Sequence, residues 1–433
     1  MPILHTYREI IMRFVSASGW LLLAVLAHLP AQAPKPTPLK ADCTRPDALH
    51  KVGETATFTV QADSDLEVAY KLTEDGHKLL KDGKLKLEKG KPTEITGTLD
   101  KPGFLQLRVN AGKVESMAAA AFEPTKIEPT TKMPADFDSF WEAQKKELAK
   151  IPLDPKIERS AKHSDDRVEC FKVSLANVDG KRVHGWIAVP KGKGPFPAIL
   201  TVPYAGVYGI EPDKRHAMMG ALAMNIIIHD IPVDEAPDFY SKQADGPLQD
   251  YRNIGMADRE KSYYRQAVLG CIRAADYLTS RPEYNGKDLA VTGGSQGGGL
   301  AIITAGVDPR VQLLAASVPA LCDHAGLASD RISGWPQWLR RVKGDDAAKV
   351  LATSAYFDAV NFARKFKGKS VLSVGFIDTA CPPTSVYAAF NALPEPKVMI
   401  AAPRLGHSTD PKFGPARDDL WKKNLPLKPP TAE

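Results

Sequence analysis

Cysteine is scarce in this sequence, and its five cysteines follow no metal-binding pattern. No two of them stand in a Cys-x-x-Cys spacing and no histidine cluster accompanies them, which argues against a zinc site. An odd number leaves at least one thiol unpaired, even if the chain is exported and forms one or two disulfides. Cys271 falls on the apolar side of a helical pattern, so we expect a small buried side chain there.

Dense basic runs are also missing. The 57 Lys and Arg residues are dispersed among 51 Asp and Glu residues, for a formal net charge of +6. This distribution favours a mixed-charge surface and argues against a nucleic-acid partner. Apolar runs of membrane length are absent as well, because the one clear run, Trp20–Ala27, is too short to span a bilayer comfortably. We therefore expect no stable membrane insertion.

The N-terminal residues have the pattern of an export signal. Arg8 and Arg13 precede the apolar run, and Ala31-Gln-Ala33 supplies a small-x-small cleavage site. Residues 1–33 are therefore predicted to be a signal peptide. The mature protein is expected to be soluble and either periplasmic or secreted.

The length of 433 residues favours two domains. Residues 40–122 contain short alternating runs of polar and apolar residues, which predict an N-terminal domain like a small β-sandwich. The predicted strands include Thr57–Gln61, Leu66–Leu72, Leu85–Leu87 and Phe104–Val109, with turns at Asp82-Gly83, Lys89-Gly90 and Pro102-Gly103. A linker rich in Pro, Thr and Lys is expected at residues 123–134.

Residues 135–425 alternate short buried strands with helical patterns, which predicts an α/β domain. Nearly continuous apolar runs of this kind are typical of a mostly parallel sheet flanked by helices. The runs are Ala198–Val202, Ala223–Ile228, Leu289–Val291, Val371–Val374 and Val398–Ala401. Helices are expected after Asp136 and over Tyr264–Leu278, where apolar residues recur at helical spacing.

One glycine-rich segment has the context of a catalytic serine. Gly293-Gly294-Ser295-Gln296-Gly297 stands between a buried strand and an apolar helix. This is the setting of the nucleophile elbow, whose glycines allow a tight strand-to-helix turn that exposes the hydroxyl. A phosphate-binding loop is the rival interpretation, and it is disfavoured because no Lys-Ser or Lys-Thr pair closes the segment.

A nucleophilic serine needs a base, and later strands supply candidates in the order Ser, Asp, His that this fold expects. Asp378 follows the strand at Val371–Val374, and His407 follows the strand at Val398–Ala401. We predict a triad in which Asp378 orients His407 and His407 takes the proton of Ser295. Three other histidines fit this order poorly and are expected to be structural or peripheral: His216, His229 and His324. Two tryptophans suit a substrate cleft and packing equally well: Trp335 and Trp338.

These motifs resemble a known family over about residues 135–425. The segments that match are Gly293–Gly298, Ser317–Asp323, Gly375–Pro383 and Leu405–His407, together with Leu278–Gly286. On these residues the chain is similar to the acetyl xylan esterases and cephalosporin C deacetylases of carbohydrate esterase family seven. The aspartate followed by Thr-Ala-Cys-Pro-Pro is more specific than the serine motif itself, and so is the stretch Leu278–Gly286. The sequence departs from the family at His229-Asp-Ile, where Arg-Gly-Gln is common, and at Ser408, where Glu is common.

The resemblance implies a function and two further site residues. The backbone N–H groups of Gln296 and Tyr204 are expected to form the oxyanion hole. The expected reaction removes O-acetyl groups from sugars such as xylan or xylo-oligosaccharides through an acetyl-serine intermediate, with no metal or organic cofactor. The expected partner is an acetylated carbohydrate, and a homo-oligomer remains open. The alternatives are a general esterase or peptidase on the same scaffold, and an inert hydrolase-like protein that binds carbohydrate.

Overall fold

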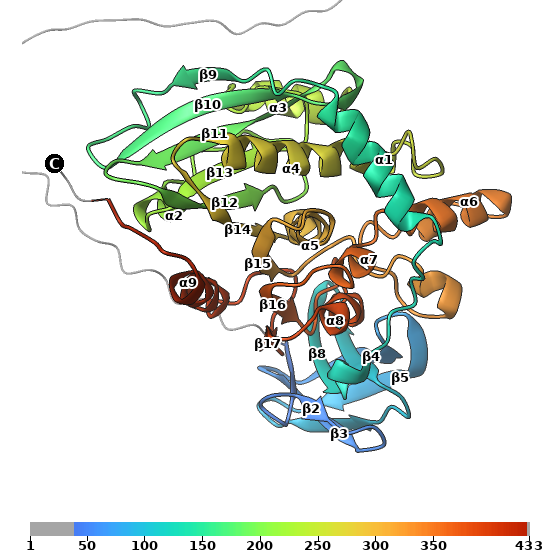
Figure 1. Cartoon of the computed structure of the whole chain (residues 1–433). Coiled ribbons are helices and arrows are strands. Elements are labelled where there is room, and N and C mark those ends of the chain that lie inside the picture. Colours follow the sequence, from blue (N-terminus) through green and yellow to red (C-terminus); the bar gives the residue numbers. More distant parts are fainter. Residues whose placement is uncertain (1–38, 431–433) are drawn as a thin grey trace, which may run out of the picture. The chain divides into compact units, whose positions relative to one another are not determined.

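A nine-stranded mixed sheet is the largest element of the computed structural model, which describes residues 39–430 (Figure 1). Its strand order is β17-β16-β15-β14-β12-β13-β11-β10-β9. The six strands from β12 to β17 are parallel, while β9, β10 and β11 pair antiparallel at one side. The strands are β9 (Lys156–Arg159), β10 (Val168–Ala176), β11 (Arg182–Pro190), β12 (Phe196–Val202), β13 (Leu222–Ile227), β14 (Tyr284–Gly294), β15 (Val311–Ser317), β16 (Lys369–Gly375) and β17 (Lys397–Ala402).

Helices cover both faces of this sheet because the central strands are apolar on both sides. Leu200 and Val291 pack into the core shared with α4, α5, α7 and α8, whereas Ile199 and Ala290 face α9. The helices of the described residues are α1 (Phe137–Ala149), α2 (Lys214–Met218), α3 (Pro237–Ala244), α4 (Tyr263–Ser280), α5 (Gln296–Val307), α6 (Asp345–Ser354), α7 (Ala359–Ala363), α8 (Pro383–Ala392) and α9 (Phe413–Asn424). The predicted α/β-hydrolase architecture, with a mostly parallel sheet between helices, is confirmed.

Two smaller sheets precede the large one. The first has the order β1-β3-β6 and the second has the order β2-β8-β7-β4-β5. Their strands are β1 (Leu39–Cys43), β2 (Leu49–His50), β3 (Ala56–Ala62), β4 (Leu66–Glu74), β5 (Lys78–Leu87), β6 (Thr93–Gly97), β7 (Gly103–Ala111) and β8 (Val114–Phe122). Fully buried aromatic side chains, among them Phe58, Phe104 and Phe122, fill their core. That core continues into the helices of the large sheet, and a separate N-terminal domain stays a prediction.

Local turn signals misled one prediction in this region. The turn predicted at Asp82-Gly83 is wrong, because both residues lie inside β5. Gly83 pairs with Tyr70 on β4, and a Cβ atom at Gly83 would lie 2.9 Å from the Tyr70 ring. The glycine therefore makes room for an aromatic ring on the neighbouring strand. The chain reverses earlier, between Glu74 and Lys78.

The structure describes the surroundings of all five cysteines but does not describe the predicted signal peptide. All five cysteine side chains are buried and carry free thiols, including Cys271 on α4. The predicted signal peptide at residues 1–33 lies outside the described residues. Within residues 39–430, no helix has the length and hydropathy needed to cross a bilayer.

Asp75 supplies a test of how the small sheets pack, because it is a fully buried acid. Burial raises the pKa of its carboxyl group to about 6, against an ordinary value of 3.8. The folded protein therefore holds this proton more tightly than the unfolded chain does. As pH rises from about 4 to 6, this group should remove on the order of 2–3 kcal/mol of stability.

We therefore predict that Asp75→Asn raises the melting temperature at pH 7 and leaves it nearly unchanged at pH 4. Asn tolerates the left-handed backbone of residue 75 (φ 55°) and can still accept the hydrogen bond from Thr384. Thermal unfolding of both proteins at several pH values measures the difference. An effect of equal size at pH 4 and pH 7 would contradict this explanation.

Candidate active site

Ser295 occupies a sharp turn between β14 and α5. Its backbone angles are φ 54° and ψ −123°, a conformation that costs energy in any residue with a side chain. Two neighbouring backbone groups hold it: the N–H of Ser295 donates to Ser317 O at 2.9 Å, and its carbonyl accepts from Ala320 N at 2.9 Å. The turn leaves the Ser295 hydroxyl half-exposed at the carboxyl edge of the sheet.

Close backbone packing explains the glycines around Ser295. A Cβ atom at Gly293 would lie 2.3 Å from the carbonyl oxygen of Gly297. A Cβ atom at Gly297 would lie 2.4 Å from the carbonyl oxygen of Val202, at the end of β12. Since real Cβ atoms do not approach so closely, the turn and the start of α5 can pack here only with glycine.

Asp378 and His407 follow the next two parallel strands beyond β15. Because parallel strands end at the same edge of a sheet, the loops after β16 and β17 reach the Ser295 turn. His407 Nε2 lies 2.9 Å from Ser295 Oγ, and His407 Nδ1 lies 2.8 Å from Asp378 Oδ2. The structure thus brings the three predicted catalytic side chains into one hydrogen-bonded chain.

The hydrogen-bond partners of His407 define which of its ring nitrogens carries the proton. A carboxylate can only accept, so His407 Nδ1 donates to Asp378 and Nε2 is free to accept from the Ser295 hydroxyl. Asp378 is 1% exposed and its Oδ1 accepts from the backbone N–H groups of Ala380 (2.8 Å) and Cys381 (2.9 Å). The hydrogen bond to Asp378 raises the pKa of His407, and partial burial opposes it.

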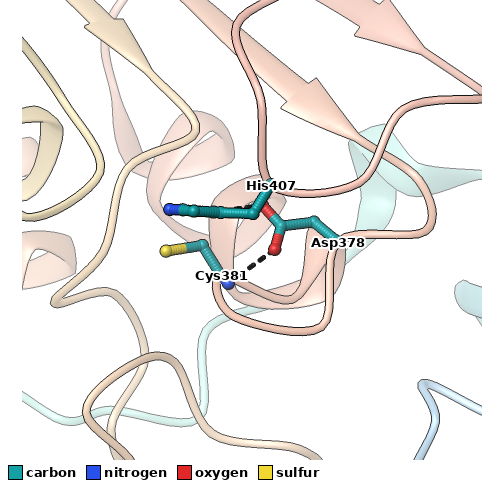
Figure 2. A group of neighbouring side chains, drawn as sticks. All are labelled: Asp378, Cys381 and His407. Atoms are coloured by element: carbon teal, nitrogen blue, oxygen red, sulfur yellow. Dashed lines mark hydrogen bonds and ion pairs between the residues drawn. The ribbon is translucent and has the colours of Figure 1, made fainter. Parts of the chain in front are cut away.

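Cys381 is a third group with ligand character at this site. Ligand atoms of Asp378, Cys381 and His407 lie within 4.8 Å of one another, and Figure 2 shows the thiol directed to the same side as the outer ring nitrogen of His407. Burial raises the pKa of the Cys381 thiol well above its ordinary range, and the nearby Asp378 carboxylate raises it further. A metal would need the thiolate, and Asp378 already receives three hydrogen bonds. The cluster is therefore organised to orient the imidazole.

The predicted oxyanion donors lie on two segments that touch. Gln296 is the first residue of α5, where N–H groups have no acceptor within the helix. Tyr204 follows β12, and its carbonyl accepts from Gln296 Nε2 at 3.5 Å. Its ring is 58% exposed and stacks on Tyr208 at 4.3 Å.

Two tyrosines that the sequence did not single out hold the Gln296 side chain. Gln296 is fully buried, and its Oε1 accepts from Tyr251 (2.8 Å) and Tyr264 (3.1 Å). The Tyr251 hydroxyl also accepts from the N–H of Gly206 at 3.2 Å, two residues after Tyr204. Tyr264 could have been suspected from the helical pattern that contains it. Tyr251 begins a three-residue 3-10 helix (Tyr251–Asn253), which is too short to give a local signal.

The remaining candidates have structural surroundings. His216 is buried and paired with Asp213, at 2.7 Å from Nδ1. His324 is buried against Trp338, which also packs on Tyr264. His229 lies closer to the site, because its Nε2 is 2.9 Å from the carbonyl oxygen of Gly206. Trp338 is buried and serves packing, while Trp335 is half-buried near Arg252.

The fold and the arrangement of Ser295, Asp378 and His407 define the general class of this protein. A serine on a strand-to-helix turn, with an aspartate and a histidine after later parallel strands, is the site architecture of α/β-hydrolases. Residues 122–425 match the family model described as acetyl xylan esterase (AXE1). The chain belongs to this family and is an esterase.

Known relatives agree with this family. The acetyl esterase Axe7A of Xylanibacter ruminicola is 34% identical over 376 residues, covering 84% of this chain and 85% of that protein. The solved acetyl xylan esterase from Paenibacillus sp. R4 is 27% identical with a TM-score of 0.60, covering 70% of this chain and 98% of that one. Acetyl xylan esterase 1 from Thermoanaerobacterium sp. JW/SL YS485 shares the fold at 22% identity, with a TM-score of 0.62, covering 70% of this chain and 97% of its own.

The His407–Asp378 hydrogen bond predicts a measurable shift. Replacing Asp378 with Asn should lower the pKa of His407, because the amide stabilises the imidazolium less than a carboxylate does. Histidine NMR titration of the labelled protein measures it. Asp230→Asn is the matched control, since Asp230 accepts from His184 at 2.9 Å at another place. The control should leave the His407 pKa unchanged. An unchanged His407 pKa in Asp378→Asn would contradict the assigned cause.

Proposed function

We propose that this esterase removes O-acetyl groups from xylan or xylo-oligosaccharides through an acetyl-serine intermediate, with Ser295, His407 and Asp378 as its catalytic residues. The observation that carries the proposal is the continuous hydrogen-bonded chain from Ser295 Oγ through the imidazole to a buried carboxylate, with distances of 2.9 and 2.8 Å. A serine hydroxyl is a weak nucleophile at neutral pH and needs such a base.

In the first half of the reaction, His407 Nε2 takes the proton of Ser295 Oγ while that oxygen attacks the acetyl carbonyl carbon. The carbonyl oxygen becomes an oxyanion that accepts hydrogen bonds from the backbone N–H groups of Gln296 and Tyr204. Asp378 stabilises the imidazolium without taking a proton. The intermediate then collapses, the bond to the sugar oxygen breaks, and that oxygen receives the proton from His407.

In the second half, water replaces the sugar. His407 takes a proton from the water as its oxygen attacks the acetyl-serine carbonyl, and the same two N–H groups hold the second oxyanion. Collapse breaks the bond to Ser295 Oγ, which regains its proton from His407. Acetic acid leaves with the second proton of the water and ionises to acetate in solution, and every group of the site returns to its starting state.

The proposed substrate and cellular location rest on the family, its relatives and the N-terminal sequence, and not on the geometry of the site. The family and the names of its relatives favour an acetylated xylan chain as the partner. The sequence pattern of residues 1–33 favours export by a cleavable signal, hence work outside the cytoplasm. Assembly into a homo-oligomer is part of the same proposal, and gel filtration with light scattering tests it.

Ser295→Ala should abolish acetate release from acetylated xylan and from acetylated xylo-oligosaccharides. We expect a loss of at least about 10⁴-fold in kcat, because the remaining site can only bind substrate and stabilise charge. Ser139→Ala, an exposed serine on α1, is the control and should keep full activity. Persistent turnover in Ser295→Ala would discard the mechanism.

Substrate breadth is tested with the same protein. Nitrophenyl acetate, butyrate and longer esters, and a dipeptide amide, separate a deacetylase from a broad esterase or a peptidase. Hydrolysis of nitrophenyl acetate without release of acetate from either xylan substrate would be consistent with the serine mechanism and would contradict xylan as the substrate. Activity on none of these substrates would favour a binding protein.

The pH dependence has a defined sign. His407 must be neutral to accept the serine proton, so kcat/KM should fall as pH drops through the pKa of His407. Since the Asp378 hydrogen bond raises that pKa, the acid limb should lie above pH 6.5. Measuring kcat/KM from pH 5 to 9 locates this acid limb of the pH profile. A limb well below pH 6.5 in the native protein would contradict the assignment of His407 as the base.

A further inference from the structure

The small N-terminal sheets contact the large sheet at the loops that carry Asp378 and His407. Strand β7 contacts α8, Gln106 on β7 bonds to Phe376 in the loop after β16, and Asp42 on β1 pairs with Arg404 in the loop after β17. The family model begins at residue 122, so seven of these strands and all but the last residue of β8 precede the matched part of the chain. These strands therefore add contacts to the rear of a site that other residues form.

Gln106 makes the most direct of these contacts. It stands on β7 among apolar neighbours and is 3% exposed, so its amide needs a partner inside the protein. Its Nε2 donates to the carbonyl oxygen of Phe376 at 3.0 Å. Phe376 is the residue after β16 and stands two residues before Asp378.

This hydrogen bond acts on one peptide plane. The carbonyl of Phe376 and the N–H of Ile377 belong to the same planar unit. The Ile377 N–H donates to Leu405 O at 3.2 Å, and Leu405 stands two residues before His407. Gln106 therefore holds one side of a peptide group whose other side joins the loop of Asp378 to the loop of His407.

Two further contacts hold the same loop. The ring of Phe104, also on β7, packs edge-on against the Phe376 ring with centroids 5.1 Å apart. At the far end of the loop, the Thr384 hydroxyl in the first turn of α8 donates to the buried carboxyl group of Asp75. Asp378 lies between these two anchor points, so both ends of its loop are held from the small sheets.

The loop of His407 has a weaker contact of this kind. Arg404 Nε lies 2.9 and 3.0 Å from the two carboxylate oxygens of Asp42 on β1. The Arg404 side chain is 59% exposed, and exposed ion pairs contribute little to holding a loop. The buried amide of Gln106 is therefore the group on which positioning depends most.

We propose that Gln106 is a positioning residue for the esterase reaction. Through the Phe376–Ile377 peptide it keeps the carboxylate of Asp378 in line with His407 Nδ1, and so keeps the imidazole aligned on Ser295. This inference rests on the proposed serine mechanism. It assigns the N-terminal strands a part in catalysis although none of their side chains reaches the reacting atoms.

Gln106→Met tests it, because methionine has a similar size and lacks the N–H donor. We expect kcat to fall about tenfold or more with KM within about twofold, as for a misaligned catalytic group. The acid limb of kcat/KM should move to lower pH, and NMR should report a lowered His407 pKa. Gln61→Met is the matched control, since Gln61 Nε2 donates to Gly90 O at 2.8 Å away from the loops.

A lower melting temperature with unchanged kcat, unchanged acid limb and unchanged His407 pKa would overturn the proposal. If Gln106→Met does not fold, Thr384→Val, which frees the other end of the same loop, carries the test with the same three readouts. Failure of the proposed function is separate, because it is read from Ser295→Ala. Inactive Ser295→Ala together with a fully active, unshifted Gln106→Met keeps the mechanism and removes only this inference.

Discussion

The backbone of Ser295 is the constraint on which the site depends. Its positive φ is unfavourable for serine, so the conformation persists only because neighbouring groups impose it. Hydrogen bonds to Ser317 and Ala320 hold the turn from the β15 side, and the approach of Gly297 to β12 holds it from the other. Contacts with three adjacent parallel strands, β12, β14 and β15, thus hold Ser295 in its strained conformation. The hydroxyl remains half-exposed because the turn cannot relax into the helix.

A second constraint sets the imidazole against that hydroxyl. The loops after β16 and β17 meet because the strands are parallel neighbours, and the bond from Ile377 to Leu405 joins them directly. Asp378 is then fixed by backbone N–H groups on one oxygen and by His407 on the other. Three hydrogen bonds therefore fix the position of the Asp378 side chain. The His407 ring is therefore oriented by a carboxylate that backbone N–H groups hold in place.

The sequence predicts those parts of the structure that depend on local patterns. Five strands of the large sheet and the helix at α4 follow from apolar runs and helical spacing. The meeting of Ser295, Asp378 and His407 follows from strand order, since parallel strands end at one edge. The strands β9, β10, β11 and β15 were not predicted. Strand β9 is exposed along its length and carries one apolar residue, so its sequence gives no strand signal. Strands β10 and β15 were missed although β10 alternates polar and apolar residues and β15 contains a short apolar run. Asp82-Gly83 was misread because its glycine serves a ring 13 residues away in sequence.

The contacts that sequence could not indicate are long-range bonds between single polar groups. Gln106 and Phe376 are 270 residues apart, and Tyr251 and Gln296 are 45 apart. Such pairs carry no periodicity, so only the folded chain reveals them. In the sequence, Gln106 and Arg108 alternate with apolar residues on the strand, as residues of a solvent-facing side do, so nothing marks Gln106 as buried. Its burial, and hence its need for a partner, is seen only in the folded chain.

The histidine at position 229 holds the segment after β12 through hydrogen bonds of a neutral ring. The related family commonly has Arg at the start of this motif, whereas burial here lowers the pKa of His229 and keeps the imidazole neutral. Because the Gly206 carbonyl can only accept, Nε2 carries the proton, and Nδ1 then accepts from the Tyr263 hydroxyl at 2.6 Å. A neutral ring thereby fixes the Tyr204–Gly206 segment from one side while Tyr251 fixes it from the other. The hydrogen bonds of His229 and Tyr251 to this segment involve neutral groups, so they bring no buried charge that would need a counterion.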